Sequence, residues 1–307
     1  SMDHNKRDYL RKGQHVEVYK SAIAGAVSGL VARLLTAPMD TLKIRYQIQP
    51  MHESKYGGML STVRTIAAEE GARGLWKGNV PASIMYVLYG AVQFSSFSTF
   101  NELLSGNNFP PVVHTLIVGA LAGMTSSVAT YPFDVLRTRF VANRGVKMFK
   151  LGVSTLEIWR HEGSQGFFRG VTSSAVSVTL STSIIFATYE SIKIFCERHK
   201  DHGIGVETLE KSASMISGVA AKIVTFPIDT VRRRILVKDS IHLGKFTKSR
   251  ATYERYREST FIRMGLSMYK HEGLLSLYRG LTMALLKTAP TTAISIGIYE
   301  WSLKKIA

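Results

Sequence analysis

The stretch Pro38-Met39-Asp40-Thr41-Leu42-Lys43-Ile44-Arg45 occurs three times in this chain of 307 residues, with small changes of residue type. The second copy is Pro132-Phe133-Asp134-Val135-Leu136-Arg137-Thr138-Arg139. The third copy is Pro227-Ile228-Asp229-Thr230-Val231-Arg232-Arg233-Arg234. The three prolines are 94 and 95 residues apart. A regular spacing of this length predicts three tandem copies of one structural unit.

A second motif follows each copy: an acidic residue and Gly, four further residues, then an aromatic residue, a basic residue and Gly. It occupies residues 70–78, 162–170 and 272–280. The interval from the motif proline to the first of these glycines is 33, 31 and 46 residues. The third unit therefore carries an insertion of about fifteen residues, within Lys238–Tyr256. These spacings predict an N-terminal tail at 1–19 and repeats at 20–108, 109–205 and 206–307.

Charged residues are nearly absent from six windows, each close to the roughly 20 residues that a helix needs to cross a bilayer. The windows are Ser21–Met39, Gly78–Asn101, Thr115–Phe133, Gly170–Tyr189, Ser212–Ile228 and Leu281–Tyr299. We expect six transmembrane helices, two in each repeat. In each repeat, the segment that connects the two predicted spans has apolar residues at the spacing of an amphipathic helix. This pattern predicts three short surface helices, at Met59–Ala68, Leu151–His161 and Phe261–His271.

The composition narrows the classes of protein that remain. A single cysteine excludes an internal disulfide framework and a multi-cysteine zinc site. The formal net charge of +17 indicates nucleic acid, anionic lipid or an anionic substrate as partner. A soluble helical repeat protein would need polar stripes along its helices, and Gly78–Asn101 has no charged residue to supply one.

The three motif pairs in register resemble the mitochondrial carrier family, over essentially the whole chain from Lys20 onward. The resemblance implies an all-α membrane protein of three tandem repeats, with six transmembrane helices in a pseudo-threefold bundle and three short matrix helices. It also implies a monomer in the mitochondrial inner membrane with a central substrate site. Five local matches are similar to the fungal branch that carries thiamine pyrophosphate: Leu10–Gln14, Ala37–Lys43, Gln93–Phe97, Tyr131–Arg139 and Lys287–Thr292.

The orientation follows from the distribution of basic residues. The three stretches assigned to the matrix side, 43–77, 137–169 and 232–279, hold 25 of the 39 Lys and Arg residues. This asymmetry resembles the positive-inside bias, and it places both termini toward the intermembrane space. The basic N-terminal tail runs against this pattern.

The first motif predicts a matrix gate. Its acid and base are three residues apart and therefore share one helix face, and the proline inside the helix is expected to kink it. Around a threefold axis the acid of one repeat meets the base of the next. The expected pairs are Asp40–Arg137, Asp134–Arg232 and Asp229–Lys43, with Gln47 similar to the bracing glutamine of the family.

The opposite gate is expected to be weak. Counting 20 residues from Gly78, Gly170 and Gly280 gives Ser98, Glu190 and Glu300, and the matching bases would be Asn101, Lys193 and Leu303. No complete ion pair can form among Ser98–Lys193, Glu190–Leu303 and Glu300–Asn101. The sequence therefore predicts a resting state that opens to the cytoplasm.

The second motif resembles the cardiolipin sites of the family. Helix N-termini bind anions through free N–H groups, so we expect a phosphate of the lipid near the start of each even-numbered transmembrane helix. The expected lipid-binding residues are Lys77, Gly78, Arg169, Gly170, Arg279 and Gly280.

Three basic residues inside the predicted spans identify the class of substrate. Ionisable groups within a bilayer are costly and usually functional. Arg33 and Lys222 each precede a gate aspartate by seven residues, and Lys287 follows Gly280 by seven. No acidic residue lies in these windows, so the three cations predict a substrate with more than one negative charge, such as a pyrophosphate. Uncharged candidates for its ring system are Met85, Tyr86, Tyr89, Gln93, Ser177 and Val178.

Other functions remain as alternatives. A carrier of a nucleotide, coenzyme A or a related phosphorylated anion would use the same cations, although the Met triplet that follows the Arg triplet of ADP/ATP carriers is absent here. The charge alone would also suit a nucleic-acid-binding helical protein. In a membrane carrier, however, gates, anionic lipid and an anionic substrate account for the positive charge without nucleic acid. The sequence predicts no enzyme activity, no cofactor and no metal site, because His161-Glu162 and His271-Glu272 lack a second histidine at metal-binding spacing.

Overall fold

The computed structural model describes residues 18–53, 55–106, 110–145, 150–199, 204–247, 250–257 and 259–306. Most of the predicted N-terminal tail, including the match at 10–14, lies outside these residues. Contacts divide the chain into a larger unit, Ala37–Leu285, and a smaller unit made of Ser1–Thr36 and Leu286–Ala307. The first and last long helices each contribute to both units.

All regular structure in the described residues is helical, as predicted. The long helices are α2 (Val18–Ile48), α4 (Asn79–Leu104), α5 (Pro111–Ala142), α7 (Val171–Arg198), α8 (Ile204–Lys238) and α13 (Leu281–Ile306). The shorter ones are α3 (Met59–Glu70), η1 (Ala72–Trp76), α6 (Leu151–Phe168), α9 (Leu243–Phe246), α10 (Arg250–Arg255), α11 (Phe261–Glu272) and α12 (Leu274–Leu277). Three of them, α3, α6 and α11, coincide with the predicted surface helices. The amphipathic part of α6 ends at Gly163, where the backbone is not helical.

The motif prolines lie inside long helices: Pro38 in α2, Pro132 in α5 and Pro227 in α8. A threonine two residues before each proline donates its hydroxyl to the carbonyl four residues earlier. The donors are Thr36, Thr130 and Thr225, with distances of 2.7 to 2.8 Å. Such back-bonding bends helices, as does an internal proline, so both devices act at the same point of each repeat.

Four described stretches are long and apolar enough to cross a membrane: Val113–Ala142, Leu151–Arg198, Ser212–Lys238 and Leu274–Ser302. They contain four of the six predicted spans. The other two predicted spans lie in α2 and α4, which are 31 and 26 residues long. Large apolar residues are exposed on several long helices, including Phe94 on α4 and Met215 on α8. Such exposure is expected where helices face lipid.

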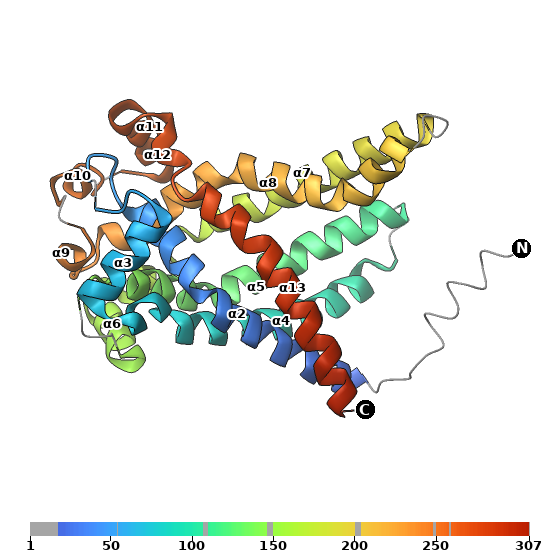
Figure 1. Cartoon of the computed structure of the whole chain (residues 1–307), viewed down its shortest axis with the longest axis horizontal. Helices are drawn as coiled ribbons and strands as arrows, with labels where there is room; N and C mark the ends of the chain where they lie inside the picture. Colours follow the sequence, from blue (N-terminus) through green and yellow to red (C-terminus); the bar gives the residue numbers. More distant parts are fainter. Residues whose placement is uncertain are drawn as a thin grey trace, which may run out of the picture. The chain divides into compact units, whose positions relative to one another are not determined.

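Within the larger unit, α4 lies beside α5, α5 beside α7, and α7 beside α8. Figure 1 shows the short helices α3, α6, α9, α10, α11 and α12 at one end of these long helices. The clustered apolar side chains of the larger unit are at this end. One cluster joins Ile44 and Ile48 to Tyr253 and Tyr256, and two others surround Tyr131 and Tyr46.

Gly78 fixes the start of α4 against α5. Its backbone is in the left-handed region (φ 79°), which glycine adopts without steric cost. A Cβ atom here would lie 2.7 Å from Val141 Cγ2 and 2.9 Å from the Arg137 carbonyl oxygen. Gly71 has nearly the same backbone conformation (φ 77°), but a Cβ atom there would meet nothing within 4 Å.

We therefore expect Gly78→Ala to lower the free energy of unfolding by about 2–5 kcal/mol, because backbone strain and overpacking add. Gly71→Ala is the matched control and should cost only the strain, about 1–2 kcal/mol. Unfolding of the two purified variants in detergent measures the difference. Equal losses would show that the approach of α5 to Gly78 contributes nothing.

Candidate functional site

Two of the three expected ring pairs form in the structure. Arg137 donates to Asp40 at 2.6 Å, which joins the first repeat to the second. Arg232 pairs with Asp134 and joins the third repeat to the second. Arg233 adds a second bond to Asp134 at 2.8 Å. These contacts link consecutive repeats at the level of the motif prolines.

The third expected pair, Asp229–Lys43, is not an ion pair in the described residues. Asp229 binds Lys222 instead, at 2.6 Å, and accepts a hydrogen bond from Ser177 Oγ at 3.2 Å. Lys43 lies over the ring of Phe226, 5.5 Å from its centroid, and Lys222 lies 5.8 Å from the same ring. Lys222 precedes Asp229 by two turns on the same face of α8, so it reaches the carboxylate without any approach of another repeat.

Gln47 does not brace a ring ion pair in the described contacts. Its side-chain amide donates to Thr230 Oγ1 at 3.3 Å, and its Oε1 is buried without a hydrogen-bond partner in the structure. Thr230 directly follows Asp229. Gln47 therefore contacts the residue beside the ring aspartate rather than the carboxylate itself.

A polar cavity of about 250 Å³ lies between α7 and α8. Its lining residues are Ser174, Ser177, Val178, Ser181, Thr182, Lys222, Thr225, Asp229 and Arg232. The cavity brings together three of the predicted substrate residues, Ser177, Val178 and Lys222, with two gate residues. Two cations and several hydroxyl groups in one cavity can donate to the oxygens of an anion such as phosphate.

Most of the hydroxyl groups in this cavity are not among the predicted substrate residues. Ser174, Ser177 and Ser181 are three and four residues apart, so they form a stripe on one face of α7. That spacing could have been found in the sequence. The predicted substrate residues gave only one member of the stripe, Ser177, because they were chosen by their distance from Gly170.

The predicted aromatic residues lie on α4. Met85, Tyr86 and Tyr89 are half-buried, and Gln93 is exposed. Tyr89 and Val178 approach the same point on α5: a Cβ atom at Gly123 would lie 3.8 Å from the Tyr89 hydroxyl and 3.7 Å from Val178 Cγ1. The structure thus brings Tyr89 close to the α7 residues of the predicted site. Arg33 and Lys287 belong to the smaller unit, on α2 and α13.

The predicted cytoplasmic-gate residues are exposed. Glu190 and Lys193 lie on the C-terminal part of α7, and Glu300 lies near the end of α13. The ion pairs of the described part of the chain include none of the three.

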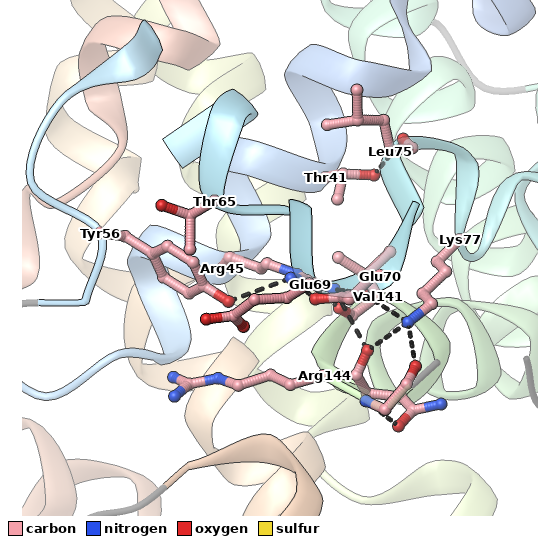
Figure 2. A network of polar contacts seen from close by, with 12 residues as sticks. Thr41, Arg45, Tyr56, Thr65, Glu69, Glu70, Leu75, Lys77, Val141 and Arg144 are labelled. Atoms are coloured by element: carbon pink, nitrogen blue, oxygen red, sulfur yellow. Dashed lines mark hydrogen bonds and ion pairs between the residues drawn. The ribbon is translucent and has the colours of Figure 1, made fainter. Parts of the chain in front are cut away.

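A network of buried charges, shown in Figure 2, lies beyond the ring on the side of the short helices. Arg45 binds both carboxylate oxygens of Glu70, one of them at 2.7 Å. Its Nε donates at 3.0 Å to the carbonyl of Val141, in the last turn of α5. Lys77 pairs with the same Glu70 and donates to the carbonyls of Asn143 and Gly145 at 2.9 and 2.6 Å.

The other two repeats contain the same network. Arg139 binds Glu162 through two bonds of 2.6 and 2.7 Å, and Arg234 binds Glu272. Each arginine also donates its Nε at 3.0 Å to a carbonyl of the next repeat: Val141, Leu236 or Gln47 in turn. All three junctions between repeats are therefore closed by an arginine that is held by its own glutamate.

These contacts correct the predicted lipid-binding role of Lys77. Its side chain is buried, and its ammonium donates to three oxygens inside the protein. Arg169 likewise binds Asp239 at 2.6 Å, and Arg279 donates to the carbonyls of Gln49 and Pro50. In each repeat the base of the second motif contacts the next repeat. The prediction had directed these side chains toward a lipid phosphate.

The network favours the charged form of two glutamates, Glu70 and Glu272. Burial opposes ionisation of Glu70, but hydrogen bonds and positive charges from Arg45 and Lys77 outweigh it and hold the pKa of Glu70 below its usual range. Burial also opposes ionisation of Glu272, and Arg234, Tyr256 and the Met51 amide lower the pKa of that carboxyl in the same way. Both groups thus stabilise the fold in their charged form.

Comparison with known proteins identifies the class of this protein. A family model described as mitochondrial carrier protein matches residues 14–108, 109–200 and 209–307. The chain belongs to the mitochondrial carrier family, as the resemblance predicted. It is a solute carrier of a mitochondrial membrane.

The relatives named mitochondrial thiamine pyrophosphate carrier 1 include three that are 46–50% identical to this chain. The one from Kluyveromyces lactis is 50% identical over 297 residues, which cover 96% of this chain and 93% of the relative. The one from Saccharomyces cerevisiae is 46% identical over 305 residues, 97% of each chain. The one from Eremothecium gossypii is 47% identical over 297 residues, 97% of this chain and 92% of the relative.

Neighbouring glutamates test the buried network. Glu70→Gln leaves Arg45 and Lys77 buried without their counter-charge and should lower the free energy of unfolding by about 3–5 kcal/mol. Glu69 is exposed, and among the described residues its one ion pair is with Lys55, at 2.5 Å, so Glu69→Gln should cost about 1 kcal/mol or less. Denaturation of the purified variants in detergent at neutral pH measures both losses.

The same variants give a pH signature. Because the pKa of Glu70 is lower in the folded than in the unfolded chain, its stabilisation is complete above the ordinary Glu pKa of about 4.3 and is lost as the pH falls below it. Glu70→Gln should therefore flatten the acid side of the stability profile, and Glu69→Gln should leave it unchanged. An acid profile that is identical in Glu70→Gln and in the wild type would contradict this account.

Proposed function

We propose that this carrier transports thiamine pyrophosphate across the mitochondrial inner membrane by alternating access, in exchange for another phosphate compound and without changing the substrate covalently. The observation that carries the proposal is the cavity in which Lys222 and Arg232 face the hydroxyl stripe of α7. The relatives' shared name narrows the anion to thiamine pyrophosphate.

The diphosphate is assigned to Lys222. Its ammonium already binds a carboxylate, Asp229, at 2.6 Å, and a diphosphate with at least two negative charges competes well for the same cation. Ser177 Oγ, which donates to Asp229, can turn to a phosphoryl oxygen. We assign Arg33 and Lys287 to the same anion from the sequence pattern. Tyr86, Tyr89, Gln93, Met85 and Val178 would hold the rings.

The ring pairs Asp40–Arg137 and Asp134–Arg232 supply the gate in this proposal. They join consecutive repeats, so the repeats cannot separate at this end while both pairs are intact. Substrate contacts that are strongest in the occluded intermediate offset the loss of these pairs. Exchange follows because a carrier without substrate lacks that compensation.

The remaining features of the proposal concern the setting of the protein. We infer that the carrier acts as a monomer, with both termini toward the intermembrane space and the short helices toward the matrix. Cardiolipin phosphates would bind at the starts of the even-numbered long helices, through backbone N–H groups near Gly78, Gly170 and Gly280. Nucleic acid has no part in this function.

Substitution of the central cation tests the substrate site. Lys222→Met should weaken thiamine pyrophosphate binding by about 10–100-fold, since a hydrogen bond to a charged group contributes roughly 1.5–3 kcal/mol. Lys287→Ala should abolish uptake by proteoliposomes without unfolding the protein. The thermal shift caused by thiamine pyrophosphate measures binding, and uptake of labelled substrate measures transport.

Asp229→Asn is the matched control for Lys222→Met. It breaks the same ion pair but keeps the ammonium, so binding should be retained or strengthened. Equal losses in the two variants would assign the effect to the ion pair and not to substrate contact. Unchanged binding and uptake in Lys222→Met and Lys287→Ala would overturn the site. ADP and coenzyme A in the same thermal-shift series test the alternative, which a larger shift than that of thiamine pyrophosphate would favour.

A further inference from the structure

The third repeat carries its insertion of about fifteen residues within the segment Lys238–Tyr256. Its described residues form α9 and α10 and the turns beside them. We name this segment the strap. It is held at its base by Lys238, whose ammonium donates to the carbonyls of Tyr256, Arg257 and Ser259 at 2.9 to 3.2 Å.

The strap binds the first repeat. Tyr253 is fully buried, and its hydroxyl donates at 2.6 Å to the carbonyl of Ile48, the last residue of α2. Thr247 donates to the carboxylate of Glu53, in the segment that follows α2, at 3.1 Å. The ring of Tyr253 belongs to the same apolar cluster as Ile44 and Ile48.

The strap also binds the second repeat. The amide of Arg144, just after α5, donates at 3.1 Å to the carbonyl of Lys245. His242 Nε2 lies 3.1 Å from a carboxylate oxygen of Glu157 on α6. The ring of Phe246 is buried in the cluster that contains Val141 and Ala142 at the end of α5.

The two neighbouring repeats are joined to each other at the same place. The guanidinium of Arg144 binds the carboxylate of Glu53 through bonds of 2.7 and 3.2 Å. Glu53 is therefore shared by Arg144 of the second repeat and Thr247 of the strap. One segment of the third repeat thus connects the ends of all three repeats.

The strap also lies where the ring is incomplete. The ring lacks a direct pair between Asp229 of the third repeat and Lys43 of the first, because Lys222 binds Asp229. The contacts of Tyr253 and Thr247 join these same two repeats.

From these contacts we propose that the strap is a latch that restrains separation of the repeats at the end of the short helices, and that its bonds must break before the carrier opens there. The inference rests on the proposed alternating access, but not on the identity of the substrate. The strap then sets how often the carrier opens at this end. Weakening its bonds should increase the open population and speed exchange.

Two tyrosines of the strap give a matched pair of variants. Tyr253→Phe removes a bond to the first repeat. Tyr256→Phe removes a hydroxyl bond of 2.7 Å, equally buried, to the carboxylate of Glu272 in its own repeat. Only the first substitution weakens the direct connection between repeats.

The separation of the repeats can be measured directly with spin labels. Cys196 is the only cysteine of the chain, so in a Cys196→Ser background Leu60→Cys on α3 and Trp159→Cys on α6 place labels on exposed positions of the first and second repeats. Pulsed electron paramagnetic resonance on proteoliposomes then gives the distance distribution without any substrate.

We expect Tyr253→Phe to increase the long-distance population about fivefold, the effect of one lost hydrogen bond, and Thr247→Val to act in the same direction. Tyr256→Phe should leave the distribution as in the wild type. If Tyr253→Phe fails to fold, Thr247→Val alone carries the test. An unchanged distribution in the strap variants, or equal changes in Tyr253→Phe and Tyr256→Phe, overturns the latch.

Exchange of thiamine pyrophosphate across the same proteoliposomes separates the two proposals. Faster exchange in Tyr253→Phe supports the latch together with the substrate assignment. Tyr253→Phe could change the distance distribution while the wild-type carrier moves no thiamine pyrophosphate. That result would overturn the proposed substrate and leave the latch standing.

Discussion

The contact on which the rest of this structure depends is the buried pair of an arginine and a glutamate that each repeat contains. Arg45, Arg139 and Arg234 are each fixed by two bonds to a glutamate of their own repeat. Because that contact leaves Nε directed at a carbonyl of the next repeat, one side chain serves both the fold of its repeat and the junction with its neighbour. The carboxylate is indispensable to this arrangement, since a buried guanidinium without a counter-charge would destabilise the protein by several kcal/mol.

The network also explains where the ring and the cavity lie. Each arginine is two residues beyond a ring base on the same helix, so an arginine that is fixed to the neighbouring repeat holds the ring residues close to that repeat as well. The cavity begins directly beside the ring, because Asp229 and Arg232 belong to its lining. In the proposed mechanism, a substrate bound to Lys222 would contact a residue that itself contacts the ring residue Asp229, so no long path of coupling would be required.

The repeat motifs made two of the three ring pairs predictable from the sequence. Threefold recurrence of an acid and a base beside a proline predicted Asp40–Arg137 and Asp134–Arg232, because symmetry alone brings such residues together. Where a residue has two partners within reach, symmetry does not decide between them. Asp229 could meet Lys43 of another repeat or Lys222 of its own helix, and the local partner forms the bond. The same limit applies to Lys77: a base at a helix start suits a lipid phosphate, and only the fold reveals that Glu70 and two carbonyls already surround it.

The proposed substrate supplies one physical reason for the departures from symmetry. Thiamine pyrophosphate has an anionic end and an aromatic end, so a site built for it would differ among the three repeats. The residue seven positions before the ring aspartate is Arg33 in the first repeat, Ser127 in the second and Lys222 in the third. In the proposed site the cation Lys222 would attract an anion; in the structure it also binds Asp229, which therefore forms no ion pair with Lys43. Tyr253 and Thr247 of the strap bond the third repeat to the first at that junction. In the proposed mechanism, the insertion adds hydrogen bonds outside the cavity between the two repeats whose ring residues, Asp229 and Lys43, do not pair.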